Sequence, residues 1–401
     1  MKIEVCPISR SKERVEFLDL GNIPIEGNLC SSREESINIE RYPMILQYFP
    51  QSKLVTLTEY IDKDKIYLNY LYHSGISKPY LEHCSEMYDY LTTYLKFKKG
   101  DVVVDIGGND GSLLLEFKKK KSDLWLINIE CSKSFIEVNK QKNINYINDY
   151  FGENIDLPIK AKLITSTNVF QHTEPLRSFV KGIYKNLSKE GIWCLEFPYL
   201  ISTLNEDNYD QAYHEHVYYY CLTPLKILFE QEGLKIIDVS FHDIHTGTLR
   251  ILSVKKDSKK EPNEDVQIYL GFEVGLDKEY CLEWGKNIYK KIEKFKEFFS
   301  DMRSNKKTIY GFGAAIKGCV FLNTCELDYN TIKYVIDDTS EKQGKFVPGT
   351  GIEVVSRDIL KTNPPDYILI LAHNFKDYII ESLRKEYKGK FIVMFPRIVI
   401  S

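Results

Sequence analysis

Long apolar runs, a strong net charge, low-complexity tracts and short repeats are all missing from this sequence of 401 residues. No apolar run reaches the roughly 18 residues that a membrane-spanning helix requires, so no membrane partner is expected. The formal net charge is −3, so the chain lacks the excess of positive charge that is typical of proteins that bind nucleic acid. The first residues, Met1 to Cys6, are typical of a strand and not of a signal peptide.

Closely spaced cysteine pairs are missing as well. The nine cysteines are scattered along the chain and none of them forms a Cys-x-x-Cys pair. An odd, dispersed set of thiols favours a reducing compartment over a disulfide framework. We therefore expect free cysteines and a cytoplasmic protein.

What is present is enough apolar sequence for more than one core. Hydrophobic residues make up 43% of the chain, so two or three domains are expected. Strand and helix patterns alternate from about residue 79, and a second series starts at residue 307. We predict an α/β fold with a small irregular N-terminal domain (1–75), a Rossmann-like domain (76–255), a linker and long helix (256–305) and a second, smaller Rossmann-like domain (306–401).

The segment from Gly100 to Leu114 is the most informative part of the chain. Val102 to Ile106 is the β-branched run of a strand that is buried on both faces, and Asp105 lies near its carboxyl end. Three glycines follow at positions 107, 108 and 111. They allow a tight turn and a close approach of the backbone to a ligand before the next helix begins.

The next apolar strand, Leu124 to Glu130, ends in an acid that can accept hydrogen bonds from ribose hydroxyls. The two strands together predict a site for a nucleoside-containing cofactor. Asp105 and Asp110 would repel the pyrophosphate of a dinucleotide, whereas they suit the cationic S-adenosylmethionine. The segment resembles the first motif of class I methyltransferases; the alternative is a glycine-rich turn of another α/β fold.

A second group of chemically active side chains lies between Tyr213 and Tyr220, in the order Tyr-His-Glu-His-Val-Tyr-Tyr-Tyr. One interpretation is a metal site made by His214, His216 and Glu215. Another is a hydrogen-bonded loop without chemistry. The third is general base catalysis, because a histidine can take a proton near neutral pH and a neighbouring carboxylate can orient it.

A series of motifs in a fixed order extends this picture to the whole chain. They are Phe17–Gly21, Tyr72–Ser74, Asp105–Leu114, Asn168–His172, Glu196–Tyr199, Tyr213–His216, Gly247–Arg250, Gly311–Gly318 and Gln343–Gly349. On these motifs the chain resembles, over its full length, the sugar C-methyltransferases that act on nucleotide-linked 4-keto sugars in branched deoxysugar and surface polysaccharide biosynthesis.

The resemblance implies a mechanism and a set of catalytic residues. A proton is removed from the carbon beside the keto group, and the enolate attacks the methyl group of S-adenosylmethionine. By motif position, His216 corresponds to the general base, and Glu215 and Tyr213 to its supporting pair. His172 and Tyr72 correspond to polar groups around the sugar, with Tyr70 as an alternative to Tyr72.

The resemblance also implies the cofactor contacts of the central domain. The loop under the methionine moiety corresponds to Asp105, Gly107, Asn109, Asp110 and Gly111. Glu130 is expected at the ribose, Asp149 and Tyr150 beside the adenine, and Asn168 at the methionine end. The alternative for Asn168 and His172 is that they cap the helix that follows them.

In the C-terminal domain, the substrate's nucleotide is expected at a second glycine-rich loop. Gly311, Gly313 and Gly318 would bring the backbone close to a diphosphate at a helix N-terminus, and Lys317 would neutralise it. Asp337 would meet a ribose or cap its strand. Tyr199 is a further substrate candidate, and Arg250 would reach the phosphates or pair with an acid at a domain seam.

One feature departs from the family pattern. The N-terminal domain of this family binds structural zinc through two Cys-x-x-Cys pairs, but here these positions read Cys6-Pro-Ile-Ser9 and Phe49-Pro-Gln-Ser52. Cys30 and Cys84 do not restore the spacing, so we predict no metal. A monomer or weak homo-oligomer is expected.

Other functions remain open on the sequence alone. A histidine base would serve an O- or N-methyltransferase as well. The C-terminal loop would also fit an NAD-dependent sugar epimerase or reductase, although that domain is short. A third alternative is a non-catalytic binding protein that retains the fold.

Overall fold

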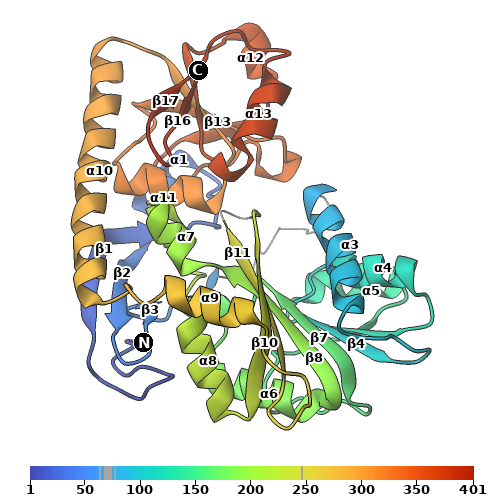
Figure 1. The fold of residues 1–401 in the computed structure, drawn as a ribbon. Coiled ribbons are helices and arrows are strands. Elements are labelled where there is room, and N and C mark those ends of the chain that lie inside the picture. Colours follow the sequence, from blue (N-terminus) through green and yellow to red (C-terminus); the bar gives the residue numbers. More distant parts are fainter. Residues whose placement is uncertain (63–64, 67–74, 76–77, 245–246) are drawn as a thin grey trace.

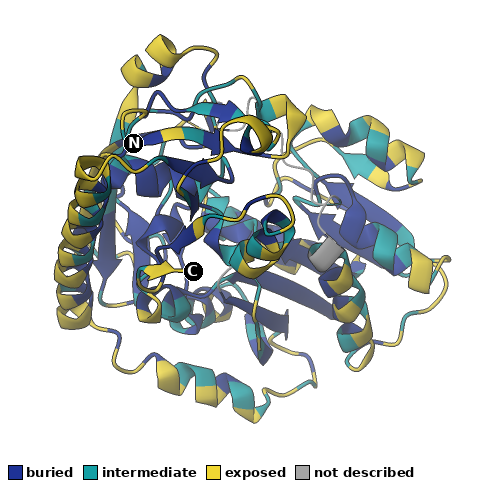
Figure 2. Cartoon of the chain, turned by 90° about the horizontal axis from the view of Figure 1, so that it is seen from above, coloured by how far each residue is buried: buried dark blue, intermediate teal, exposed yellow. Residues whose placement is uncertain are grey.

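A computed structural model describes residues 1–62, 65–66, 75, 78–244 and 247–401. Three sheets organise the described chain. Figure 1 shows the C-terminal part above the central sheet, with the N-terminal strands beside it and the long helix α10 (Lys278–Ser304) along one edge. The strands are mostly buried, and the exposed residues lie mainly on peripheral helices and loops (Figure 2).

The central sheet has the order β10-β11-β8-β7-β4-β5-β6. β11 is antiparallel to its neighbours β8 and β10, and the pairs between β8 and β6 are parallel. The strands are β4 (Val102–Ile106), β5 (Trp125–Ile129), β6 (Asn145–Ile147), β7 (Ala161–Thr167), β8 (Leu187–Pro198), β10 (Leu234–His242) and β11 (Thr248–Lys255). This arrangement confirms the predicted class I methyltransferase fold.

Helices cover both faces of this sheet because its strands are apolar on both sides. Val103 and Leu163 pack in one buried cluster with side chains of α3 (Lys78–Thr92) and α4 (Ser112–Lys120). Val102 and Val104 face the opposite cluster, which includes side chains of α6 (Leu176–Asn186) and α8 (Leu222–Gln231). The short helices α5 (Ile136–Gln141) and α7 (Leu200–Asn205) lie in the connections.

The C-terminal sheet has the order β14-β13-β12-β15-β16-β17, parallel except for the last pair. Its strands are β12 (Ile309–Phe312), β13 (Ile332–Ile336), β14 (Glu353–Val355), β15 (Tyr367–Ile370), β16 (Lys390–Val393) and β17 (Val399–Ile400). Its helices are α11 (Ile316–Thr324), α12 (Ile359–Thr362) and α13 (Lys376–Leu383). The second Rossmann-like fold is therefore confirmed.

The N-terminal sheet is antiparallel, in the order β1-β2-β3-β9. It contains β1 (Val15–Pro24), β2 (Arg41–Phe49), β3 (Leu54–Leu57) and β9 (Tyr218–Tyr219), and α1 (Arg33–Asn38) lies between its first two strands. β2 was not predicted. β9 belongs to the Tyr213–Tyr220 segment, so the fourth strand of this sheet comes from far along the chain.

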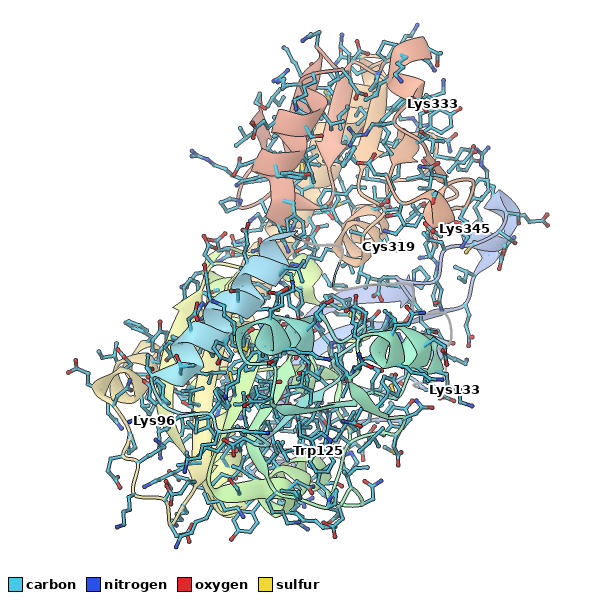
Figure 3. The ribbon with its side chains drawn as sticks, turned by 90° about the vertical axis from the view of Figure 1, so that its right-hand side faces the viewer. Lys96, Trp125, Lys133, Cys319, Lys333 and Lys345 are labelled. Carbon is cyan, nitrogen blue, oxygen red and sulfur yellow. The ribbon has the colours of Figure 1, made fainter. Side chains whose placement is uncertain are left out.

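Helix α10 joins the three parts. Its Gly285 lies so close to β1 that an added Cβ would be 1.8 Å from the Phe17 carbonyl oxygen. Further along the helix, Phe295 packs against Phe321 and Phe395 of the C-terminal part. Helix α9 (Glu264–Phe272) precedes α10, within the stretch predicted as linker. Figure 3 shows Cys319, on α11, near the side of the C-terminal part that faces the rest of the molecule.

Among the described residues, no helix is long and apolar enough to cross a membrane. All nine cysteines are free thiols.

Candidate active site

The glycine-rich loop after β4 is held against its neighbours without spare room. An added Cβ at Gly107 would be 2.4 Å from Val169 Cγ2, and one at Gly108 would be 2.6 Å from Asn128 Oδ1. Gly107, Asn109 and Gly111 have positive φ angles of 65°, 52° and 76°, which favour glycine and asparagine. The loop therefore presents bare backbone at the carboxyl edge of the sheet.

Two buried amides that the sequence analysis did not single out brace this loop. Asn128 Oδ1 accepts a hydrogen bond from the Gly108 N–H at 3.1 Å, and its Nδ2 donates to the Asn109 carbonyl at 3.0 Å. Asn139 Nδ2 donates to the same carbonyl at 3.0 Å. For Asn128 the sequence holds a signal, because this polar residue interrupts the apolar run Leu-Ile-Asn-Ile of β5.

Two acids at the loop, Asp110 within it and Glu130 beside it, make different contacts. Asp110 Oδ1 accepts hydrogen bonds from the Ser112 N–H at 3.2 Å and the Ser112 hydroxyl at 2.6 Å. Its side chain therefore serves the start of α4. Glu130, at the end of β5, accepts from the Asn109 N–H at 3.2 Å and the Ser132 N–H at 2.9 Å. Its half-buried carboxylate thus lies directly beside the glycine loop.

Asp105 is the buried acid of the site. The Thr165 hydroxyl donates to its Oδ1 at 2.7 Å. Burial raises the pKa of Asp105 to about 7, repulsion from Glu130 and Glu196 adds to the shift, and the Thr165 hydrogen bond opposes it. A positive charge nearby would favour its ionised form.

Asn168 follows β7 with a φ of 54°. Its Oδ1 is buried and has no hydrogen-bond partner. A buried acceptor without a partner is unfavourable unless a ligand supplies a donor. The loop, Asp105 and this acceptor therefore fit a cationic, amino-acid-bearing nucleoside such as S-adenosylmethionine. Asp149 and Tyr150 lie exposed after β6, with Tyr150 50% exposed.

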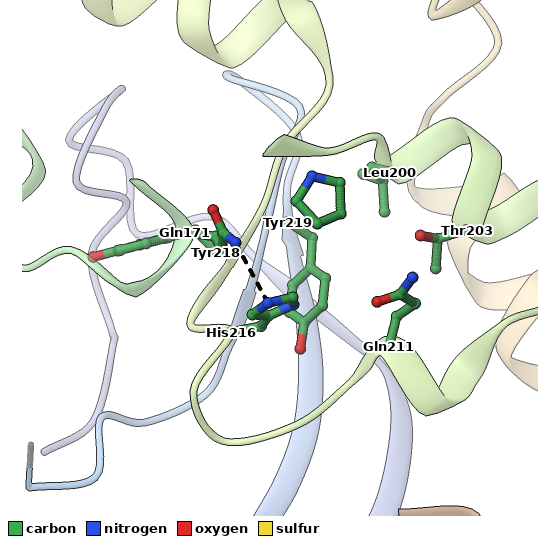
Figure 4. A pocket seen from close by; sticks show the side chains of 8 residues that line it. Gln171, Leu200, Thr203, Gln211, His216, Tyr218 and Tyr219 are labelled. Carbon is green, nitrogen blue, oxygen red and sulfur yellow. Dashed lines mark hydrogen bonds between the residues drawn. The ribbon is translucent and has the colours of Figure 1, made fainter. Parts of the chain in front are cut away.

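The Tyr213–His216 segment brings a histidine and a phenol together. The Tyr213 hydroxyl lies 2.5 Å from His216 Nε2, and their ring centroids are 3.8 Å apart. His216 is 5% exposed. It lines a cavity with Gln171, Thr203 and Gln211 (Figure 4). Gln171 Nε2 lies 3.5 Å from His216 Nε2, whereas its Oε1 is buried without a partner.

His172 connects this segment to the cofactor edge. Its ring centroid lies 5.0 Å from that of His216, edge to face. Burial lowers the pKa of His172 to about 4, although backbone hydrogen bonds to Glu215 and Asn168 oppose the shift. His172 is therefore neutral at physiological pH, and both Asn168 and His216 lie beside it.

Glu215 departs from its expected role. It lines a second cavity with His172 and His214, whereas His216 lines the first. Burial raises the pKa of Glu215 to about 8, and the nearby Glu26 adds to the shift. A carboxyl that is neutral at pH 7 does not stabilise an imidazolium ion. The Tyr213 hydroxyl, by contrast, contacts His216 Nε2 directly.

In the described part of the chain, no group of three or more His, Cys, Asp or Glu side chains lies close enough together to hold a metal ion. At the zinc-motif positions, Cys6 Sγ lies 3.1 Å from Ser52 Oγ and accepts a hydrogen bond from the Ser9 N–H at 3.3 Å. The contact between Cys6 and Ser52 joins these two turns directly.

Two predicted substrate contacts are engaged elsewhere. Arg250 is 1% exposed, and its Nε donates to Glu196 Oε1 at 2.6 Å, with His83 Nε2 2.9 Å from the same carboxylate oxygen. Of the two interpretations of Arg250, contact with the substrate phosphates and pairing with an acid, the structure shows the pairing. The Tyr199 hydroxyl donates to Glu273 at 3.2 Å, which points it away from a substrate role. Tyr70 and Tyr72 lie outside the described residues.

The C-terminal glycine loop has a close backbone approach of its own. Gly313, with a φ of 93°, and Gly318 lie against Ala372 and Leu371, where an added Cβ would be 2.9 Å and 2.8 Å from a side-chain atom. Gly311 also lies against Leu371. The loop crosses from β12 towards β15, where the strand order reverses, and this is where α/β sheets bind ligands.

The polar groups at this edge come from α11, from the ends of β13 and β15, and from the segment before Tyr213. Lys317 Nζ donates to Asn374 Oδ1 at 3.2 Å, and His373 Nε2 lies 2.8 Å from Asp210 Oδ2. Burial lowers the pKa of Lys317 to about 8. Asp337 accepts from the Ala314 N–H at 2.8 Å and the Thr339 N–H at 2.9 Å. Its contacts are those of a strand cap.

Comparison with known proteins gives independent support. A family model described as a methyltransferase domain matches residues 80–239, and one described as a C-methyltransferase C-terminal domain matches residues 243–396. The C-methyltransferase NovU of Streptomyces niveus is 26% identical over 405 residues, which cover 98% of this chain and 96% of that protein.

Other similarities are partial. The carboxy-S-adenosyl-L-methionine synthase of Nautilia profundicola is 32% identical over 124 residues, covering 29% of this chain and 51% of that protein. A solved S-adenosylmethionine-dependent methyltransferase from Clostridium acetobutylicum is 12% identical, covers 46% of this chain and 92% of its own, and has a TM-score of 0.36. That score is too low to add to the fold assignment. The two family models and the full-length similarity to a C-methyltransferase support an S-adenosylmethionine-dependent C-methyltransferase family for this chain.

Proposed function

We propose that this enzyme methylates the carbon beside the keto group of a nucleotide-linked 4-keto sugar, in branched deoxysugar and surface polysaccharide biosynthesis. The observation that carries the proposal is the buried His216, which contacts the Tyr213 hydroxyl at Nε2 and lies one histidine away from the cofactor edge. Free, mostly buried cysteines support a reducing compartment, and we propose the cytoplasm.

The chain's own residues account for the proton transfer. Carbon is a poor nucleophile, so the enolate must be formed before methyl transfer. His216 acts as the general base, and Tyr213, which contacts Nε2, orients its ring. Neutral His172 and the buried Gln171 amide supply polar contacts for the sugar and its developing oxyanion. S-adenosylmethionine supplies the electrophilic methyl group.

The cofactor is held by the carboxyl edge of the central sheet. Glu130 would bind the ribose hydroxyls, and Asn168 Oδ1 would accept from the ammonium group of the methionine end. The backbone of residues 107–111 would contact the methionine moiety, and Asp105 would provide negative charge. Asp149 and Tyr150 would contact the adenine.

The nucleotide end of the substrate is bound by the C-terminal loop. Lys317 is the cation for the diphosphate, at the first turn of α11, and the glycines at positions 311, 313 and 318 admit the phosphate close to the backbone. Tyr70 and Tyr72 remain proposed sugar contacts. In this proposal the central sheet binds the cofactor, and the C-terminal sheet binds the nucleotide of the substrate.

The test is mass spectrometry of a panel of nucleotide-linked 4-keto sugars, each paired with its reduced 4-hydroxy form, after incubation with enzyme and S-adenosylmethionine. We expect a gain of one methylene on a keto sugar and none on its reduced partner. Methylation of a sugar without a ketone would instead indicate O- or N-methyl transfer. Absence of any product across the panel would contradict the substrate class.

A further inference from the structure

A buried carboxylate from the N-terminal part reaches the catalytic segment. Glu26 lies just after β1 and is 3% exposed. Its Oε1 is 3.0 Å from His214 Nδ1, and both of its oxygens accept the His214 N–H at 3.4 Å. The neighbouring Gly27 faces Glu215, because an added Cβ would be 3.6 Å from Glu215 Oε1. Glu26 therefore lies against the two residues that precede His216.

Its burial is not explained by stability. Removing a carboxylate from water costs several kcal/mol, and a well-packed apolar pair of similar volume is often at least as stable. Here two acids, Glu26 and Glu215, are both buried around one imidazole. Like charges at such a site cannot both ionise without a large penalty, so one of them holds a proton. Titratable groups arranged in this way are concentrated at functional sites.

We propose that Glu26 is a positioning residue that fixes the Tyr213–His216 segment through His214 and keeps the Glu215 carboxyl in its acid form. The inference rests on the proposed function, since it deepens the role of the same site. In the acid form, Glu215 can donate a hydrogen bond into its cavity, where a ketone oxygen that gains negative charge would accept it.

The surroundings of Glu215 agree with this assignment. Among the described residues, the titratable groups that line its cavity with it are Tyr60, His172, Glu174 and His214, and the charge of Glu26 acts on it from nearby. His172 is neutral at physiological pH, since burial lowers its pKa to about 4. The negative charge of Glu26 raises the pKa of Glu215 beyond the effect of burial. Replacing that one charge should therefore change the titration of Glu215.

The experiment is an infrared titration of the protonated carboxyl band in the full-length protein with S-adenosylhomocysteine bound. The band of Glu215 is identified by its loss in Glu215→Gln, and that of Asp105 by its loss in Asp105→Asn. In wild type the Glu215 band should disappear with a midpoint near pH 8. In Glu26→Gln the midpoint should move down by about 1 pH unit or more.

Two further variants separate charge from fold. Glu16→Gln removes an exposed acid of β1 and should leave the midpoint unchanged. Glu26→Asp keeps the charge and should keep the raised midpoint even if a shorter side chain lowers the melting temperature. A Glu26→Gln midpoint equal to that of wild type would overturn the proposal.

The readout is independent of turnover. If the midpoint shifts but wild type methylates no keto sugar, the proposed function fails while the role of Glu26 in Glu215 protonation stands. If wild type methylates the keto sugar and the pH profile of Glu26→Gln superimposes on that of wild type, the positioning role fails while the function stands.

Discussion

His216 and Tyr213 are three positions apart, and the structure closes this interval into one hydrogen-bonded pair of 2.5 Å. Backbone geometry supports it, because the His216 N–H donates to the Tyr213 carbonyl at 2.9 Å. The turn thus presents the phenol to the imidazole. Orientation of this kind is what a general base requires from its supporting partner.

Replacing Tyr213 by Phe tests that support. The variant should retain proton exchange and methyl transfer at a rate about 10-fold below wild type, which corresponds to the loss of one hydrogen bond of about 1.4 kcal/mol. The measurement is single-turnover methyl transfer at saturating substrate. Complete loss of activity would instead make the tyrosine hydroxyl the group that accepts the proton.

Asp105 makes the stability of the cofactor-free protein depend on pH. Burial raises its pKa to about 7 in the folded chain, above the ordinary value of 3.8, so folding favours the protonated form. Its contribution is fully present below pH 4 and is lost as the pH rises through 7. Between pH 4 and 8, wild type should lose up to about 4 kcal/mol of unfolding free energy relative to Asp105→Asn.

Denaturant unfolding of both proteins across this range is the measurement. The difference between them should grow as the pH rises. Parallel curves for wild type and Asp105→Asn would show that folding does not raise the pKa of Asp105 and would contradict the burial effect.

At the scale of elements, the conformation of the glycine loop between β4 and α4 is restricted by the side chains packed against it. Gly108→Ala would place a Cβ 2.6 Å from Asn128 Oδ1 and 2.7 Å from Asp105 Oδ2. We expect a loss of about 1–3 kcal/mol in stability and a loss of S-adenosylhomocysteine binding by calorimetry.

The matched control for this substitution is Gly271→Ala in α9, where an added Cβ meets nothing within 4 Å. It should leave cofactor binding unchanged and raise stability slightly, because alanine favours a helix over glycine. Equal cofactor affinity in the two variants would contradict the close fit of the loop.

Much of the element order could be predicted from the sequence, and the exceptions have physical causes. β4, β7 and β11 follow from apolar, β-branched runs. β2 was missed because Pro43 interrupts its pattern; the proline lies at the edge of an irregular stretch of the β1–β2 register. The roles of Glu26 and of β9 were missed because both depend on distant pairing, and Glu26 and His214 are 188 positions apart.

The same limit applied to the site. The Asp105–Gly111 motif and the Tyr213–Tyr220 segment could be singled out from local sequence, whereas His216 was proposed as the base from the family resemblance. The partner of Arg250 was left as an alternative, because a sequence does not show that Glu196 lies opposite it on the neighbouring strand. The protonation of Glu215 depends on burial and on Glu26, neither of which local sequence shows.

At the scale of the molecule, all three parts hold the segment of residues 210–220, which carries the proposed catalytic side chains. Its start is bound to the C-terminal part through Asp210 and His373. Its end is a strand of the N-terminal sheet, where Val55 pairs with Tyr219. The central domain holds its middle, because the Val217 N–H donates to the Gln171 carbonyl. The proposed base is therefore positioned only in the assembled protein.

Separate sites for cofactor and nucleotide predict separable binding. Lys317→Met should weaken the binding of a nucleoside diphosphate by about 10- to 100-fold, the effect of losing a charge-assisted hydrogen bond, with S-adenosylhomocysteine affinity unchanged. Lys333→Met, an exposed lysine of β13, is the control and should change neither. Calorimetry with a set of nucleoside diphosphates measures both affinities, and equal effects of the two variants would contradict the assignment.

The most direct test of the account is hydrogen exchange at the carbon beside the ketone. Wild type and His216→Asn are incubated in heavy water with a keto-sugar substrate and S-adenosylhomocysteine, so that no methyl group is available. Wild type should introduce deuterium at that carbon, and His216→Asn should do so at least about 100-fold more slowly, with unchanged S-adenosylhomocysteine affinity. Equal exchange by the two proteins would show that His216 is not the base.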